Sequence, residues 1–132
     1  MNTPDHSHEQ PDLSIVIPLL NEAESLPELY QQVLTALEPT GKSFEILFID
    51  DGSRDGSFEI IRRMREGDKR IRAIQFRRNY GKSAALAVAF EAVRGEVVVT
   101  MDSDLQDDPG EVPAMIDQLE EGYDLVSGWK QK

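Results

Sequence analysis

Residues 13–37 read LSIVIPLLNEAESLPELYQQVLTAL, and they carry two different hydrophobic patterns in succession. Leu13–Pro18 is a short apolar run rich in β-branched residues, which is typical of a strand buried on both faces. Apolar side chains then recur at the spacing of an amphipathic helix, at Leu26, Leu29, Tyr30, Val33, Leu34 and Leu37. Ser25 and Glu28 have the spacing of a capping box at its start. The stretch is therefore predicted to form a strand followed by a helix.

This pattern recurs along the whole chain. Further apolar runs predict strands at residues 44–49, 71–76, 97–101 and 125–129. The helices predicted between them are marked by Phe58, Ile61 and Met64, by Leu86, Ala89, Phe90 and Val93, and by Val112, Met115, Ile116 and Leu119. Strands and helices that alternate at intervals of roughly 30 residues indicate right-handed βαβ units. We therefore expect an α/β fold with a doubly wound, mostly parallel sheet.

Composition limits both the size of the domain and the partners it can take. The chain has 132 residues, 39% of them hydrophobic, so residues 13–132 are expected to form one domain after a disordered polar tail at 1–12. The net charge of −11 opposes binding to nucleic acid. Cysteine is absent, which excludes a disulfide framework, a thiolate nucleophile and a cysteine zinc site. No run approaches the roughly 18 apolar residues of a membrane helix, so this chain alone is expected to be soluble.

Polar clusters follow the first four predicted strands, at residues 18–22, 50–56, 77–82 and 102–108. In open α/β sheets, ligands bind outside the carboxyl ends of the strands. Because parallel strands end at the same edge of a sheet, the four clusters are expected to meet on one rim. Arg77 and Arg78 belong to this rim, whereas most basic residues that precede them are typical of a solvated helix face.

Asp102 and Asp104 are separated by one residue at the end of a predicted strand, where extended backbone points both side chains to one side. Two such hard oxygen ligands suit Mg²⁺ or Mn²⁺ together with a substrate phosphate. The sequence therefore predicts a metal site here. Asp107 and Asp108, directly before Pro109, are instead interpreted as caps of the next helix.

The acidic pair Asp50 and Asp51 leaves two interpretations open. These carboxylates either accept hydrogen bonds from the ring or ribose of a nucleotide, or they shape an ordinary Asp-Gly turn. A calcium loop is excluded, because the twelfth position of an EF-hand that starts at Asp51 would be Arg62 in place of glutamate.

Gly81-Lys82-Ser83 is like the end of a phosphate-binding P-loop, but residue 76, where the first glycine is required, is Phe. A simpler anion site remains, in which a helix N-terminus is joined by Lys82 and by Arg77 or Arg78. A dinucleotide fold is disfavoured, because the turn at residues 19–22 contains no glycine.

Four motifs occur in a fixed order: Val16-Ile-Pro-Leu-Leu-Asn-Glu22, Ile49-Asp-Asp-Gly-Ser53, Arg78-Asn-Tyr-Gly-Lys82 and Met101-Asp-Ser-Asp-Leu-Gln106. With these motifs the chain resembles family 2 glycosyltransferases of the GT-A fold, and among them the dolichyl- or polyprenyl-phosphate sugar synthases. The resemblance implies that the nucleotide is contacted by Pro18, Leu20, Glu22, Ile49 and Asp51. It also implies a D-x-D element for metal and diphosphate, formed by Asp102, Ser103 and Asp104, with Gln106 at a position that can complete the metal site.

The same resemblance implies an activity and an acceptor. A sugar would pass with inversion from a nucleotide diphosphate donor, such as UDP-glucose or GDP-mannose, to a polyprenyl phosphate at the cytoplasmic face of the cell membrane. Asp104 and Asp102 would act in catalysis through the metal, which stabilises the departing diphosphate. The acceptor phosphate is already an anionic nucleophile.

Members of this family extend beyond the part matched here, with acceptor-site residues and amphipathic or membrane helices. We therefore expect the chain to be a donor-binding part that binds nucleotide sugar and metal with little turnover. Membrane contact would come only through the segments that are absent. An open sheet edge at the last predicted strand could promote homo-oligomers.

Three other functions fit parts of the pattern. A haloacid-dehalogenase-like phosphatase also uses Asp-x-Asp after a strand, but Leu105 stands where threonine or valine is expected. A glycosidase would need only the two carboxylates Asp102 and Asp104. A binding module without catalysis could retain the nucleotide rim, and it is the main non-enzymatic alternative.

Overall fold

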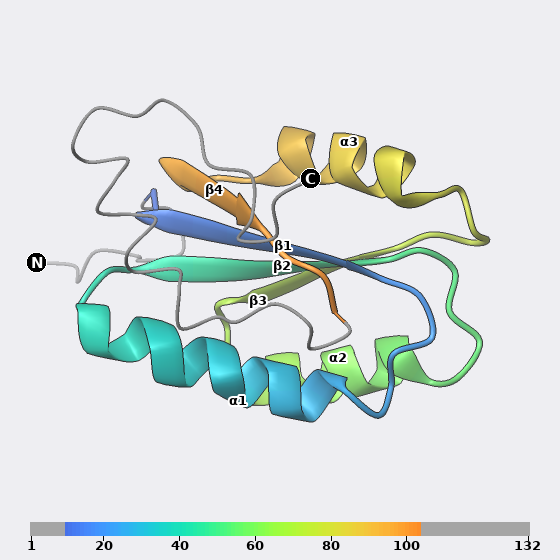
Figure 1. Ribbon diagram of the computed structural model, residues 1–132, viewed down its shortest axis with the longest axis horizontal. Coiled ribbons are helices and arrows are strands. Elements are labelled where there is room, and N and C mark those ends of the chain that lie inside the picture. The colour runs from blue at the N-terminus through green and yellow to red at the C-terminus, as the bar shows by residue number, and fades with distance from the viewer. Residues whose placement is uncertain (1–9, 104–132) are drawn as a thin grey trace, which may run out of the picture.

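The computed structural model describes residues 10–103, which form alternating strands and helices (Figure 1). In chain order the elements are β1 (Leu13–Leu19), α1 (Leu26–Leu37), the 3-10 turn η2 (Glu38–Thr40), β2 (Phe44–Asp50), α2 (Ser57–Gly67), β3 (Ile71–Gln75), α3 (Lys82–Ala92) and β4 (Val97–Thr100). The helix expected around Val112 and the strand expected at 125–129 lie outside the described residues. Between residues 10 and 103, no helix is both long and apolar enough to cross a membrane.

The four strands form one parallel sheet in the order β3-β2-β1-β4. The chain winds outward from β1 through β2 to β3, and then returns to place β4 on the other side of β1. The parallel α/β fold expected from the sequence is confirmed. This order also creates a switch point between β1 and β4, the position at which open α/β sheets have a ligand-binding crevice at the carboxyl edge.

Helices cover both faces of the sheet (Figure 1). Because side chains alternate along a strand, Ile15 and Ile17 of β1 enter the core that α1 and α2 cover, whereas Val16 faces α3. On the α3 side, Val16 packs in one cluster with Ala85 and Ala89, which are fully buried. The small alanines let α3 lie close to the sheet.

Two helix details differ from the sequence prediction. Ser25 precedes α1 but makes no capping hydrogen bond, and its hydroxyl donates to Glu22 Oε2 over 2.9 Å. Its backbone is already helical, with φ −86° and ψ −19°, so the capping box with Glu28 does not form. Phe90 was expected on the core face of α3 but is 54% exposed. Ala89, which was expected on that face, is buried there, and Ala85, one helical turn earlier, is buried beside it, with Leu86 and Val93 packed against the same cluster.

Candidate functional site

Two neighbouring cavities open at the carboxyl edge of the sheet. The switch-point cavity, of about 400 Å³, lies where β1 and β4 end. The following predicted site residues line it: Pro18, Leu20, Glu22, Asp51, Lys82, Asp102 and Ser103. The structure thus brings together residues from all four post-strand segments. Ile49 is the exception among the described residues, because its side chain is fully buried and packs in the core cluster beneath α3.

Asp51 orients the loop that leads into α3. Its side chain is almost buried, and its two oxygens accept the backbone N–H groups of Tyr80, over 2.7 Å, and Gly81, over 3.0 Å. Helix α3 begins at the next residue, Lys82. Each carboxylate oxygen has a second lone pair, so Asp51 retains the capacity to accept a hydrogen bond from a ligand in the switch-point cavity.

Lys82 and Asp102 form an ion pair across this cavity. The Lys82 Nζ lies 2.7 Å from Asp102 Oδ1, and the two side chains are 52% and 22% exposed. The predicted cation at the start of α3 is therefore present, but its ammonium is held against the carboxylate that follows β4. The cavity wall therefore carries the Lys82 ammonium, which could contact a phosphate, beside the Asp102 carboxylate, which could contact a cation.

A metal centre can be assessed only in part. Within residues 10–103 no group of three or more His, Cys, Asp or Glu side chains is arranged to hold a metal ion. Asp102 supplies one hard oxygen ligand at the cavity wall, which fits the Mg²⁺ or Mn²⁺ predicted from the sequence. Asp104 and Gln106, the other predicted ligands, lie outside the described part of the chain.

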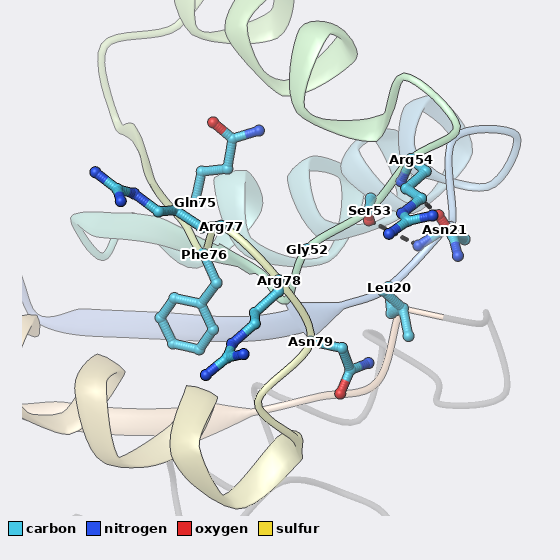
Figure 2. A pocket seen from close by; sticks show the side chains of 10 residues that line it. All are labelled: Leu20, Asn21, Gly52, Ser53, Arg54, Gln75, Phe76, Arg77, Arg78 and Asn79. Atoms are coloured by element: carbon cyan, nitrogen blue, oxygen red, sulfur yellow. Dashed lines mark hydrogen bonds between the residues drawn. The ribbon is translucent and has the colours of Figure 1, made fainter.

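The second cavity, of about 540 Å³, is lined by Arg54, Arg77 and Arg78 and is called here the arginine-lined cavity. It shares Leu20 and Asn79 with the switch-point cavity. Figure 2 shows that the three arginine side chains point in different directions rather than toward one point. The guanidinium of Arg78 instead lies 4.9 Å from the ring centroid of Tyr80. This wall is basic, but the arginines do not converge on a single anion.

Several lining residues were given no role in binding by the sequence analysis. Asn79 and Gly81 line the switch-point cavity, and Asn21, Ser53 and Gln75 line the arginine-lined cavity. All except Gln75, the last residue of β3, fall within the polar segments that follow the strands. Position after a strand was therefore the useful signal, and residue type was not, because asparagine, serine and glycine are also common in ordinary turns.

A parallel α/β domain with its polar side chains gathered at a switch point belongs to the class that binds small ligands, often nucleotides, at the carboxyl edge. The family follows from comparison with known proteins. The model described as "Glycosyl transferase family 2" matches residues 14–132, and this chain belongs to that family. The resemblance inferred from the four motifs is thereby confirmed.

Curated relatives share nearly half of the aligned residues. The undecaprenyl-phosphate 4-deoxy-4-formamido-L-arabinose transferase of Salmonella typhimurium strain LT2 is 45% identical over 120 residues, and the protein of that name from Salmonella dublin is 44% identical over 120 residues. Each match covers 90% of this chain and 37% of the relative. The chain therefore spans little more than a third of the length of these relatives.

Solved glycosyltransferases have the same fold. A mannosyltransferase from Pyrobaculum calidifontis, solved in complex with GDP-Man and Mn²⁺, is 25% identical with a TM-score of 0.68, over 81% of this chain and 31% of that one. TarS residues 1–349 of S. aureus, solved with UDP, gives a TM-score of 0.70 at 23% identity, over 83% of this chain and 32% of that one. The GT-A architecture expected from the motifs is confirmed by these neighbours.

Proposed function

We propose that this chain is the donor-binding part of a glycosyltransferase that moves a sugar from a nucleotide diphosphate donor to a polyprenyl phosphate. The carrying observation is the switch-point cavity, which gathers Glu22, Asp51, Lys82 and Asp102 from four separate segments. Polar groups of both signs meet there at the position where α/β folds bind nucleotides. UDP-linked and GDP-linked sugars are both compatible with this arrangement.

Different residues of the switch-point cavity would contact different parts of such a donor. Lys82 offers the ammonium that would face the diphosphate, and Asp51 offers acceptor lone pairs for the nucleoside. Asp102 and Asp104, with Gln106, would hold Mg²⁺ or Mn²⁺. When bound, the ion supplies Lewis-acid stabilisation of the negative charge on the leaving diphosphate. The mannosyltransferase solved with GDP-Man and Mn²⁺ supports this assignment.

The acceptor is proposed from the relatives. Their names specify undecaprenyl phosphate, and this chain is 45% identical to them over 120 residues. Direct attack by that phosphate on the anomeric carbon would invert its configuration, and the acceptor needs little help from a base because it is already anionic. In the whole protein we place the reaction at the cytoplasmic face of the membrane. We expect this chain, which matches 37% of the relatives' length, to bind donor with little turnover.

Calorimetry with UDP-sugars and GDP-sugars, each with and without Mn²⁺, tests the proposal. We expect one nucleotide class to bind, and to bind more tightly with the ion. Asp102→Asn and Asp104→Ala should each weaken ion-dependent binding on the order of tenfold, because a charged metal ligand is lost. Glu59→Gln is the matched control, since Glu59 is an exposed carboxylate of α2 that lines neither cavity.

Two results would contradict the proposal. One is donor affinity that neither Mn²⁺ nor the two aspartate substitutions change. The other is hydrolysis of a simple phosphate ester without any nucleotide, which would favour the phosphatase alternative.

A further inference from the structure

The loop between β1 and α1 is attached to the loop between β2 and α2 by side chains. Three successive backbone N–H groups of the first loop each donate to a side-chain oxygen of the second loop or of Ser57, the first residue of α2. The pairs are Asn21 N–H to Ser53 Oγ at 2.7 Å, Glu22 N–H to Ser57 Oγ at 3.0 Å, and Ala23 N–H to Asp55 Oδ2 at 3.1 Å. We call these three hydrogen bonds the loop clamp. It joins two loops that are more than 30 residues apart in the chain.

A fourth hydrogen bond runs in the opposite direction. The backbone N–H of Arg54 donates to Asn21 Oδ1 over 2.8 Å, so each loop both donates and accepts hydrogen bonds (Figure 2). Asn21 has a positive φ of 55°, a conformation that asparagine tolerates better than most residues. The first loop is thus held in a backbone conformation that a free segment would rarely keep.

Asp55 and Ser57 fix each other's orientation. Asp55 Oδ1 accepts both the backbone N–H and the hydroxyl of Ser57, over 3.0 and 2.5 Å. The hydrogen bond from that hydroxyl is the main cause that lowers the pKa of Asp55, so at neutral pH Asp55 is a carboxylate and can only accept. The hydroxyl hydrogen of Ser57 must therefore point at Asp55, which leaves its lone pair directed at the N–H of Glu22.

We propose that Asp55 and Ser57 are positioning residues for the donor, which hold Leu20 and Glu22 in the binding conformation without touching the ligand themselves. Neither residue lines the switch-point cavity or the arginine-lined cavity, whereas Leu20 and Glu22 line the switch-point cavity. The inference rests on the proposed function. A loop that is already ordered in the free protein loses less conformational entropy when the donor binds. Removing the clamp should therefore weaken affinity more than it weakens the fold.

The other edge of the sheet offers a matched control. Asp12 Oδ2 accepts the backbone N–H of Ser43, and the Asp12 N–H donates to Ser43 Oγ, both over 2.9 Å. This contact also joins two segments through a partly exposed aspartate, but these segments precede β1 and β2 instead of following them. Asp12→Ala and Asp55→Ala therefore remove the same kind of interaction from opposite edges.

The test compares nucleotide affinity by calorimetry with unfolding in urea for Asp55→Ala, Ser57→Ala, Asp55→Asn and Asp12→Ala. Asp55→Ala and Ser57→Ala should each weaken binding on the order of tenfold, with urea midpoints close to that of Asp12→Ala. Asp55→Asn keeps one acceptor oxygen and should recover part of the affinity. Asp12→Ala should leave affinity unchanged.

Amide hydrogen exchange provides a readout that does not depend on nucleotide. The N–H groups of Asn21, Glu22 and Ala23 should be protected in the unaltered chain and exchange faster in Asp55→Ala. Equal exchange in the two proteins, or equal affinity of Asp55→Ala and Asp12→Ala for nucleotide, would overturn the positioning role. Protected amides in a chain that binds no nucleotide would instead refute the proposed function, and with it any role of the clamp in binding.

Discussion

The two edges of the sheet hold their carboxylates in opposite ways. At the amino edge, Glu45 is 3% exposed and is closed off by a salt bridge to Arg72 at 2.8 Å. At the carboxyl edge, Asp51 accepts the backbone N–H groups of Tyr80 and Gly81, and Asp102 pairs with Lys82. The first edge neutralises its charge within the protein. The second keeps acceptor capacity, which a binding site needs and a structural network does not.

The network at the amino edge is also complete in its hydrogen bonds. Glu45 accepts the Ser14 hydroxyl and the backbone N–H of Arg94, and the N–H of Gly95 donates to Ser14 Oγ. Burial by itself would raise the pKa of Glu45, but hydrogen bonds from Ser14, Arg72 and Arg94 outweigh it and lower the pKa. At the carboxyl edge, by contrast, Asp50 Oδ2 is buried without any hydrogen-bond partner among the described residues.

The largest effect is expected from Glu45→Ala. The substitution leaves the Ser14 hydroxyl and the Arg94 N–H without their carboxylate acceptor, and Arg72 without its ion-pair partner. We expect a loss of about 3 kcal/mol in the free energy of unfolding. Urea denaturation measures it, with the exposed α2 residue in Glu59→Ala as control at about 0.5 kcal/mol or less. Because the pKa of Glu45 is lowered in the folded state, its contribution to stability is present above the unfolded pKa of about 4.3. That contribution is lost as the pH falls through the folded pKa.

Weaker nucleotide binding by a folded Glu45→Ala protein would contradict this division between a structural amino edge and a binding carboxyl edge. In that case the amino edge would also shape the site.

Substitutions at two glycines, Gly52 at the carboxyl edge and Gly95 at the amino edge, distinguish an effect on stability from an effect on nucleotide binding. An added Cβ at Gly52 would lie 2.5 Å from the carbonyl carbon of Arg78, and at Gly95 it would lie 2.6 Å from that of Leu13. Gly52 also has φ of +87°, which L side chains rarely adopt. We expect Gly52→Ala and Gly95→Ala each to cost about 2 kcal/mol in unfolding free energy, measured in urea.

Only the carboxyl-edge substitution should affect the donor. Gly52 lets the loop after β2 pack against Arg78 and Asn79, and Asn79 lines both cavities. Calorimetry at a temperature where both variants are folded should show nucleotide affinity reduced on the order of tenfold for Gly52→Ala and unchanged for Gly95→Ala. Similar losses in the two variants would mean that affinity merely follows stability.

Local patterns were sufficient to predict the parallel sheet. Runs such as Leu13–Pro18 and the alternation of strand and helix identify the βα units, because burial imposes the same periodicity wherever the unit occurs. It was harder to predict which side of a helix faces the sheet. Helix α3 is apolar on most sides, so its sequence correctly indicated Ala89 on the sheet-facing side but did not reveal that Ala85 also faces the sheet and that Phe90 is exposed.

The site was predictable at the level of segments and less so at the level of contacts. Placement after a strand identified the loops that carry Glu22, Asp51 and Asp102. The roles proposed for Asp55 and Ser57 were not predicted, since an aspartate two residues before a serine is typical of any turn that leads into a helix. Their partners lie more than 30 residues away, and only the folded sheet brings the two loops together.

The smallest effect is expected at the amino edge from Tyr30→Phe. The Tyr30 hydroxyl donates to Asp68, whose carboxylate also pairs with Arg70 at 2.8 Å. Burial and the hydrogen bond to Asp68 raise the pKa of Tyr30 to about 12. We expect a loss of about 1 kcal/mol in unfolding free energy at neutral pH, measured in urea, and no change in nucleotide affinity.

The pH dependence distinguishes this hydrogen bond from simple packing. Because the folded pKa is raised, the contribution of Tyr30 is complete below the unfolded value of about 10 and is lost as the pH rises through about 12. The stability difference between the two proteins should therefore shrink across that interval, and near-ultraviolet absorbance should show one tyrosine fewer ionising at its upper end. A constant difference would mean that the hydroxyl contributes through packing alone, and that the amino edge depends on closed hydrogen-bond networks less than Glu45 suggests.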